Sequence, residues 1–129
     1  MVGIVIISHS SKVADGVKEL AEQMAQGVPI ASAGGTADER LGTDIEKIIE
    51  AVNKVYSEDG VAVLFDLGSA YMNAEMAIEF FEKEKQNRIE IIDTALVEGA
   101  VTAAVESSIG KSLEEVKESV KSMCLHKIR

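Results

Sequence analysis

Short apolar runs alternate along the chain with longer segments in which apolar residues recur every three or four positions. Apolar runs of about four to eight residues bounded by turn formers are typical of fully buried strands, whereas the longer periodic segments are typical of amphipathic helices. The strands predicted in this way cover residues 2–7, 30–33, 61–65 and 89–92. The predicted helices cover residues 13–24, 45–55, 70–81, 95–108 and 113–120.

Capping residues mark the start of two predicted helices. Thr43 is followed three residues later by Glu46, which is the sequence of a capping box in front of the second helix. Ser112 and Glu115 repeat this spacing before the last helix. The charged run at residues 82–85 is predicted to end the third helix.

The alternation of strands with helices predicts the fold class. Helical crossovers between successive strands make a parallel sheet, so we expect an α/β fold with an open, mostly parallel sheet and helices on both faces. The chain has 129 residues and no internal repeat or linker, so residues 1–129 are expected to form a single domain.

The composition excludes several classes of partner. The net charge of −9 and the lack of a basic stripe argue against nucleic-acid binding. No apolar run approaches the roughly 20 residues that span a bilayer, so no membrane segment is expected. The single cysteine, Cys124, has no partner for an internal disulfide, and no leader is recognised before the first strand, so we expect a cytoplasmic protein.

His9 is the main candidate for chemistry because it follows the first buried strand directly. The carboxyl ends of parallel strands form the ligand-binding edge of an open α/β sheet. An imidazole at this edge can carry a proton, bind a metal or accept a phosphoryl group. Asp66, which follows the third strand, is a suitable partner, since a carboxylate on one ring nitrogen fixes the tautomer and leaves the other nitrogen as a nucleophile.

Small and polar residues at the same edge are predicted to bind a phosphate or a partner. Ser10 and Ser11 begin the first helix, where free backbone N–H groups and the helix dipole favour a phosphate. Glycines in the neighbouring loops allow close backbone approach. The remaining candidates of this kind are Gly34, Gly35, Thr36, Gly68 and Ser69.

Each of these residues also has an ordinary structural interpretation. His9 could cap a turn, and Asp66 could be a simple helix cap. Arg40 could reach a phosphate, but a solvated loop arginine is the more common state. Cys124 and His126 are too few for a metal site, which needs three or four ligands, so they are interpreted as incidental and no metal is expected.

The absence of known motifs narrows the enzyme classes. The chain lacks GxGxxG after its first strand, and it lacks GxxxxGK[ST] and GxSxG, which removes the main support for dinucleotide, nucleoside-triphosphate and hydrolase sites. One nucleophile with little else fits a phosphoryl carrier better than an enzyme that remodels a small substrate.

Four blocks in order carry a resemblance to a known family. They are residues 3–10, residues 33–36 with 42–43, residues 66–70 with Asn73 and Glu75, and residues 96–100 with Ala103 and Ala104. These blocks span essentially the whole chain. In them the chain resembles the DhaM family, which comprises the phosphotransfer subunits of phosphoenolpyruvate-dependent dihydroxyacetone kinases. The fold of this family is that of the mannose-type IIA proteins. Ala95 departs from the family pattern, which has proline there, at a helix start.

The resemblance implies a phosphotransferase role. His9 would accept a phosphoryl group from the phosphocarrier protein HPr and pass it to ADP held by a partner subunit, DhaL. The resulting ATP would phosphorylate dihydroxyacetone on a third subunit, DhaK. No cofactor would be bound by this chain, since ADP, ATP and Mg²⁺ are expected on DhaL. The family also implies a homodimer, and the lack of fused HPr-like and enzyme I-like domains implies that a separate HPr is used.

Two alternatives remain open. The chain could be the IIA domain of a mannose-type sugar transporter, which passes its phosphoryl group to a IIB protein. It could also be a non-catalytic regulatory module of the same fold. An Asp66 contact to Nδ1 of His9 would leave Nε2 as the phosphorylated nitrogen.

Overall fold

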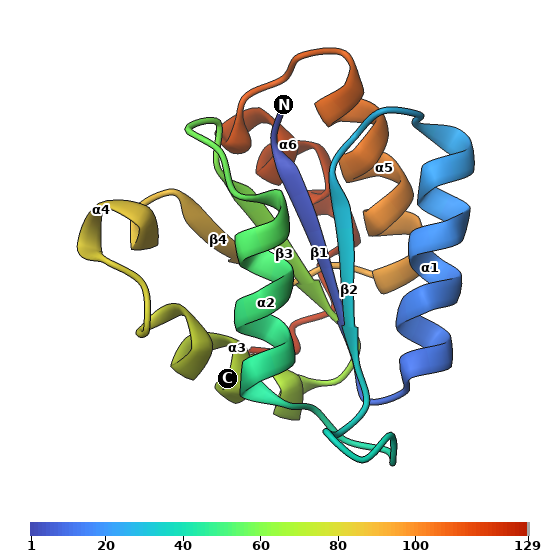
Figure 1. The fold of residues 1–129 in the computed structure, drawn as a ribbon. Coiled ribbons are helices and arrows are strands. Elements are labelled where there is room, and N and C mark those ends of the chain that lie inside the picture. The colour runs from blue at the N-terminus through green and yellow to red at the C-terminus, as the bar shows by residue number, and fades with distance from the viewer. Residues whose placement is uncertain (129) are drawn as a thin grey trace.

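Four parallel strands form one sheet in the computed structural model, which describes residues 1–128 (Figure 1). The strands are β1 (Gly3–Ser8), β2 (Ile30–Gly34), β3 (Val61–Phe65) and β4 (Ile89–Ile92), and their order across the sheet is β2-β1-β3-β4. The register pairs Ile7 of β1 with Ala33 of β2 and with Phe65 of β3. The predicted parallel sheet is therefore confirmed, and each predicted strand agrees with the observed one to within one residue at either end.

Helices cover both faces of this sheet, as predicted (Figure 1). The helices are α1 (Ser11–Met24), α2 (Ile45–Val55), α3 (Gly68–Ile78), α4 (Lys83–Gln86), α5 (Leu96–Ser108) and α6 (Leu113–Ser119), and a 3₁₀ turn follows at Lys121–Met123. Helices α1, α5 and α6 pack on one face, whereas α2 and α3 pack on the other.

Strand β1 is buried on all sides, because β2 and β3 pair with its two edges and helices cover both of its faces. Ile4 and Ile6 point toward α1 and α5, while Val5 and Ile7 point toward α2 and α3. Each such side chain contributes about 1.5–3 kcal/mol by leaving water, so the apolar run that predicts this strand also fixes its position in the sheet. The residue that follows β1 is therefore held on a rigid support.

The predicted range of 45–55 for the second helix matches α2, but its predicted capping box is wrong. The N-cap of α2 is Asp44, whose carboxylate accepts a 3.0 Å hydrogen bond from the backbone amide of Lys47. Thr43 therefore does not form the predicted capping box with Glu46, and its hydroxyl accepts instead from Asn73 of α3. Two adjacent residues that both favour N-caps left the sequence ambiguous by one position.

The third helix ends earlier than predicted. Helix α3 stops at Ile78, and the amide of Phe81 donates to the Ile78 carbonyl at 3.0 Å in a tight turn. Glu82 is extended and begins α4, so the charged run starts a separate short helix and does not end α3.

The predicted capping box of Ser112 and Glu115 is confirmed at the start of α6, where both reciprocal hydrogen bonds are present.

Among residues 1–128, none of the helices combines the length and the apolar composition that a bilayer crossing requires.

Candidate functional site

Three loops meet at the carboxyl edge of the sheet. Strands β1, β2 and β3 are neighbours and parallel, so the segments that follow them emerge side by side. The backbone amide of Gly42 donates to the His9 carbonyl at 2.7 Å, and the amide of Gly35 donates to the Ser8 carbonyl at 3.2 Å. The amide of Asp66 donates to the Ile7 carbonyl at 3.1 Å. The structure therefore brings together the three loops that were expected at the carboxyl edge of a parallel sheet.

The Asp66 carboxylate holds His9 at two points. One carboxylate oxygen lies 3.0 Å from Nδ1 of the imidazole, and the other accepts a 3.0 Å hydrogen bond from the His9 backbone amide. The same carboxylate accepts from the backbone amide of Leu67 at 2.7 Å and from the Ser8 hydroxyl at 2.8 Å. The predicted contact to Nδ1 is present, and it fixes the orientation of the ring.

These hydrogen bonds keep Asp66 ionised. Burial acts to raise the pKa of Asp66, but the hydrogen bonds from the His9 amide, the His9 ring, the Leu67 amide and the Ser8 hydroxyl outweigh it, so the pKa lies below its ordinary value of 3.8. An ionised carboxylate only accepts hydrogen bonds, so Nδ1 of the neutral imidazole carries the proton. The lone pair then belongs to Nε2.

Ser69 lies at the other ring nitrogen. Its Oγ is 2.8 Å from Nε2 of His9, a distance at which the hydroxyl donates to the lone pair. Ser69 belongs to the first turn of α3, one turn from the loop that carries Asp66. Both ring nitrogens are thus held by one short segment, while the His9 side chain is still 25% exposed.

Ser8 is a site residue that the sequence analysis missed. Its side chain is fully buried, and its hydroxyl donates to Asp66 and accepts from the backbone amide of Ser10 at 3.0 Å. The only sequence signal was a polar residue as the last residue of an otherwise apolar strand. Such a position must have polar partners because burying an unpaired hydroxyl is costly.

The two serines after His9 begin α1, as predicted. The Oγ of Ser10 accepts a 3.3 Å hydrogen bond from the backbone amide of Val13 and is the N-cap, and Ser11 is the first helical residue. Gly34 lies directly beneath them, because a Cβ at this position would be 2.7 Å from the Ser10 carbonyl oxygen. Gly34 therefore lets β2 approach the helix start, which is a structural role.

The other loop candidates, Thr36, Gly35 and Gly68, make contacts with residues other than His9. Thr36 donates to Asp38 at 2.6 Å and accepts from the Arg40 backbone amide, so its hydroxyl is used within its own loop. Gly35 has a φ of 75°, which favours glycine. A Cβ on Gly68 would lie 2.8 Å from the carbonyl oxygen of Lys127.

Arg40 and the two C-terminal candidates do not join the His9 site. The Arg40 side chain is 81% exposed and pairs with Asp38 at 2.9 Å. Cys124 and His126 lie after the last helix, and within residues 1–128 no group of three or more metal-ligating side chains was found.

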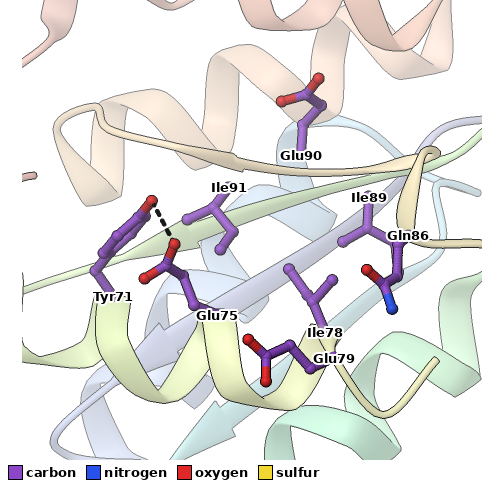
Figure 2. Close-up of a pocket in the computed structure, with 8 residues that line it drawn as sticks. All are labelled: Tyr71, Glu75, Ile78, Glu79, Gln86, Ile89, Glu90 and Ile91. Atoms are coloured by element: carbon purple, nitrogen blue, oxygen red, sulfur yellow. Dashed lines mark hydrogen bonds between the residues drawn. The ribbon is translucent and has the colours of Figure 1, made fainter. Parts of the chain in front are cut away.

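A separate hollow lies between α3 and β4 (Figure 2). Its lining includes Glu75, Glu79 and Glu90 but no lysine or arginine. The hydroxyl of Tyr71 donates to Glu75 at 3.0 Å, and burial together with this glutamate raises the pKa of Tyr71 (Figure 2). Three carboxylates repel a phosphate, so this hollow does not compete with the edge around His9 as a phosphoryl site.

Comparison with known families defines the class of protein. The EIIA-man family model, described as "PTS system fructose IIA component", matches residues 3–117. The chain therefore belongs to the mannose-type EIIA family of the phosphotransferase system.

Curated relatives narrow the family further. A DhaM subunit of PEP-dependent dihydroxyacetone kinase 2 from Listeria innocua is 39% identical over 90% of this chain and 94% of its own length. A DhaM subunit from Lactococcus lactis is 34% identical over 97% of this chain and 98% of its own. The chain belongs to the DhaM phosphoryl donor subunits. It matches only 25% of the longer Escherichia coli DhaM, at 39% identity.

Two solved structures have a similar fold. A crystal structure of a protein of unknown function matches with a TM-score of 0.83 and 32% identity over 95% of both chains. A sigma-54 interaction domain protein from Enterococcus faecalis has a TM-score of 0.70 at 19% identity, which shows the shared fold alone.

Proposed function

We propose that this chain carries a phosphoryl group on Nε2 of His9, from HPr to ADP bound by DhaL, in a PEP-dependent dihydroxyacetone kinase. DhaK would hold the dihydroxyacetone. The observation that carries the proposal is the 3.0 Å contact of Asp66 with Nδ1, which leaves Nε2 as the nucleophile at an exposed edge. The names of the DhaM relatives support the kinase as the system.

The proposed transfer has two steps, phosphorylation of His9 by HPr and donation of the phosphoryl group to ADP. The Nε2 lone pair attacks the phosphorus of phospho-HPr, and the bond between phosphorus and HPr breaks as the new P–N bond forms. The ring becomes positively charged, and the Asp66 carboxylate at Nδ1 stabilises this charge. On DhaL, a terminal oxygen of ADP attacks the same phosphorus, and the neutral ring leaves. Transfer of this kind needs mainly alignment and charge stabilisation.

The backbone at the start of α1 supports this role. The first amides of a helix have no partners within the helix, and the helix dipole favours negative charge there. Ser11 begins the 14-residue α1 only two positions after His9. We propose that these amides, with the Ser69 hydroxyl, donate hydrogen bonds to the phosphoryl oxygens after transfer.

The position of the site sets how the partners bind. His9 is reached from one edge of the sheet, so HPr and DhaL would use the same surface and bind in turn. The chain carries 22 acidic and 13 basic residues, so a partner surface with basic residues would be favoured. We propose a homodimer on the family resemblance, with no metal or nucleotide bound by this chain.

The experiment that tests the proposal follows a phosphoryl group through the chain. The chain is incubated with [³²P]phosphoenolpyruvate, enzyme I and HPr, and DhaL with bound ADP is then added. We expect one label per chain, followed by loss of label and formation of ATP. His9→Asn should take no label, whereas His126→Asn, which changes the other histidine, should behave as the native chain does.

The alternatives give different results in the same experiment. Label that stays on His9 with DhaL but moves to a IIB protein would show a transporter IIA role. If the native chain takes no label from phospho-HPr, it is a non-catalytic module and the proposal fails.

A further inference from the structure

The segment at residues 125–128 is tied to the carboxyl edge of the sheet by Asp93. This carboxylate follows β4 and accepts hydrogen bonds from the backbone amides of Leu125, Lys127 and Ile128. The Leu125 and Ile128 bonds measure 3.3 and 3.0 Å. Three amides on one carboxylate give the segment a defined path, although it contains no helix or strand.

The Lys127 side chain bridges the ends of two strands. Its ammonium donates to the carbonyl of Phe65 at 2.6 Å and to the carbonyl of Thr94 at 2.8 Å. The last residue pair between β3 and β4 is Leu64 with Ile92, so the Lys127 ammonium links the segments that follow these two strands just beyond their last pair. The Nζ atom also lies 4.6 Å from the centre of the Phe65 ring.

The environment of Lys127 is that of a structural cation and not of a solvated surface lysine. Its side chain is half-buried, and burial lowers the pKa of Lys127, while the charges of the Asp93 and Asp66 carboxylates act in the opposite direction. Its backbone carbonyl packs against Gly68, at the start of α3. Lys127 therefore contacts the residues on either side of Asp66, because its ammonium binds the Phe65 carbonyl and its own carbonyl lies against Gly68, the residue before Ser69.

The Phe65 carbonyl belongs to the peptide unit that joins Phe65 to Asp66. A carbonyl held at 2.6 Å by a charged donor fixes the plane of this peptide, and the plane sets the direction in which the Asp66 carboxylate leaves the backbone. A small rotation of the peptide would move the carboxylate away from His9 Nδ1, which it contacts at 3.0 Å. The amide side of the same peptide is held by the 3.1 Å hydrogen bond from Asp66 to the Ile7 carbonyl, so Lys127 supplies the anchor on the carbonyl side.

We propose that Lys127 is a positioning residue for His9, which acts by fixing the Phe65–Asp66 peptide so that Asp66 holds the Nδ1–H tautomer. The inference rests on the proposed function for its effect on phosphoryl transfer, but its effect on the imidazole is independent of any partner. The same arrangement makes Lys127, together with the Asp93 carboxylate that binds its backbone amide, a support of the site.

Two readouts test Lys127, and one of them uses the unphosphorylated chain alone. The ¹⁵N chemical shifts of the His9 ring report the tautomer, and the rate of labelling by phospho-HPr reports the transfer. We expect Lys127→Gln to lower the Nδ1–H population and to slow labelling about tenfold, with an unchanged KM for HPr. Lys127→Arg keeps the charge and both donors and should restore most of the rate. Lys121→Gln, an exposed lysine in the same region, should change neither.

The outcomes separate this inference from the proposed function. If Lys127→Gln has the same His9 tautomer and labelling rate as Lys121→Gln, Lys127 has no positioning role. If Lys127→Gln does not fold, Asp93→Ala releases the segment without touching the lysine, and a native tautomer in that variant would overturn the inference. If Lys127→Gln changes the His9 tautomer but the native chain takes no label from phospho-HPr, the positioning role of Lys127 stands and the proposed function is refuted.

Discussion

The Asp66 carboxylate and His9 are joined by two hydrogen-bonding contacts, one to the backbone amide and one to the ring, although the residues lie 57 positions apart. The hydrogen bond to the amide fixes the position of the His9 backbone, and the contact with Nδ1 fixes the orientation of the imidazole ring. A carboxylate that made the ring contact alone would leave the imidazole free to swing with its loop. The double contact explains how a partly exposed histidine can have a single orientation.

The phosphorylated nitrogen of His9 should be Nε2. Nδ1 lies 3.0 Å from Asp66 and carries a proton, whereas Nε2 has a lone pair that only the Ser69 hydroxyl contacts among the described residues. Two-dimensional ¹H–¹⁵N spectra of the phosphorylated chain distinguish the two isomers. A phosphoryl group on Nδ1 would contradict the assignment and would require the Asp66 contact to break during transfer.

The Asp66 carboxyl should titrate below 3.8, because its hydrogen bonds outweigh the effect of burial on its pKa. A carboxyl whose pKa is lower in the folded chain stabilises the fold above its unfolded pKa and loses this contribution as the pH falls through the folded pKa. The contribution is therefore complete at neutral pH and is lost only below about pH 4. The ¹³Cγ shift of Asp66 measures the midpoint directly, and a midpoint above 3.8 would show that burial dominates.

Replacing Ser8 by alanine should destabilise the chain and weaken the hold on Asp66. The buried hydroxyl donates to Asp66 and accepts from the Ser10 amide, so its loss leaves buried partners unsatisfied at a cost of about 1–3 kcal/mol. The pKa of Asp66 should also rise, since one hydrogen bond to its ionised form is lost.

Urea unfolding of Ser8→Ala measures the first effect, and the Asp66 ¹³Cγ titration measures the second. Ser108→Ala is the matched control, since it removes an exposed hydroxyl far from the site and should change stability by less than about 0.5 kcal/mol. Equal unfolding free energies for the two variants would show that Ser8 does not support the site.

Gly34→Ala should be destabilising by about 1–3 kcal/mol, because its new Cβ would lie 2.7 Å from the Ser10 carbonyl oxygen and from the Ser11 Cα. These contacts are backbone atoms at the start of α1, so relief of the clash would displace the residues next to His9. Thermal unfolding and the labelling rate should both decline.

Gly16→Ala provides the opposite case for comparison. Gly16 lies within α1, and a Cβ there meets nothing within 4 Å, so this substitution should stabilise the chain by about 0.5–1 kcal/mol. If both alanine variants shift the unfolding temperature in the same direction, the close packing of β2 against α1 is not as described.

The fold was predictable because the apolar runs are buried on both faces of the sheet. The four strands could be located from their apolar runs, and because parallel strands all end at one edge of the sheet, His9 and Asp66 could be placed at that edge. The N-cap of α2 was less predictable, since Thr43 and Asp44 are adjacent and both suit the position. Only the packing of Thr43 against Asn73 decides between them.

The supporting residues of the site were not predictable in the same way. Ser8 is one polar residue in a strand, and the sequence does not say which partner its hydroxyl finds. Lys127 belongs to a segment without periodicity, and its role depends on Asp93 folding that segment back across the sheet. Hydrogen bonds between segments distant in sequence leave no local pattern, so only the structure reveals them.

Because Asp66 and Ser69 hold the two nitrogens of one ring, the resting imidazole cannot flip about its Cβ–Cγ bond without losing both contacts. A phosphoryl donor that approaches this edge meets a nitrogen whose lone pair the exposed Ser69 hydroxyl already contacts. The Nε2 lone pair can attack phosphorus only when this hydroxyl has rotated away from it. Ser69 therefore has two positions in the proposed cycle, one at the lone pair of the resting ring and one beside the phosphoryl oxygens after transfer.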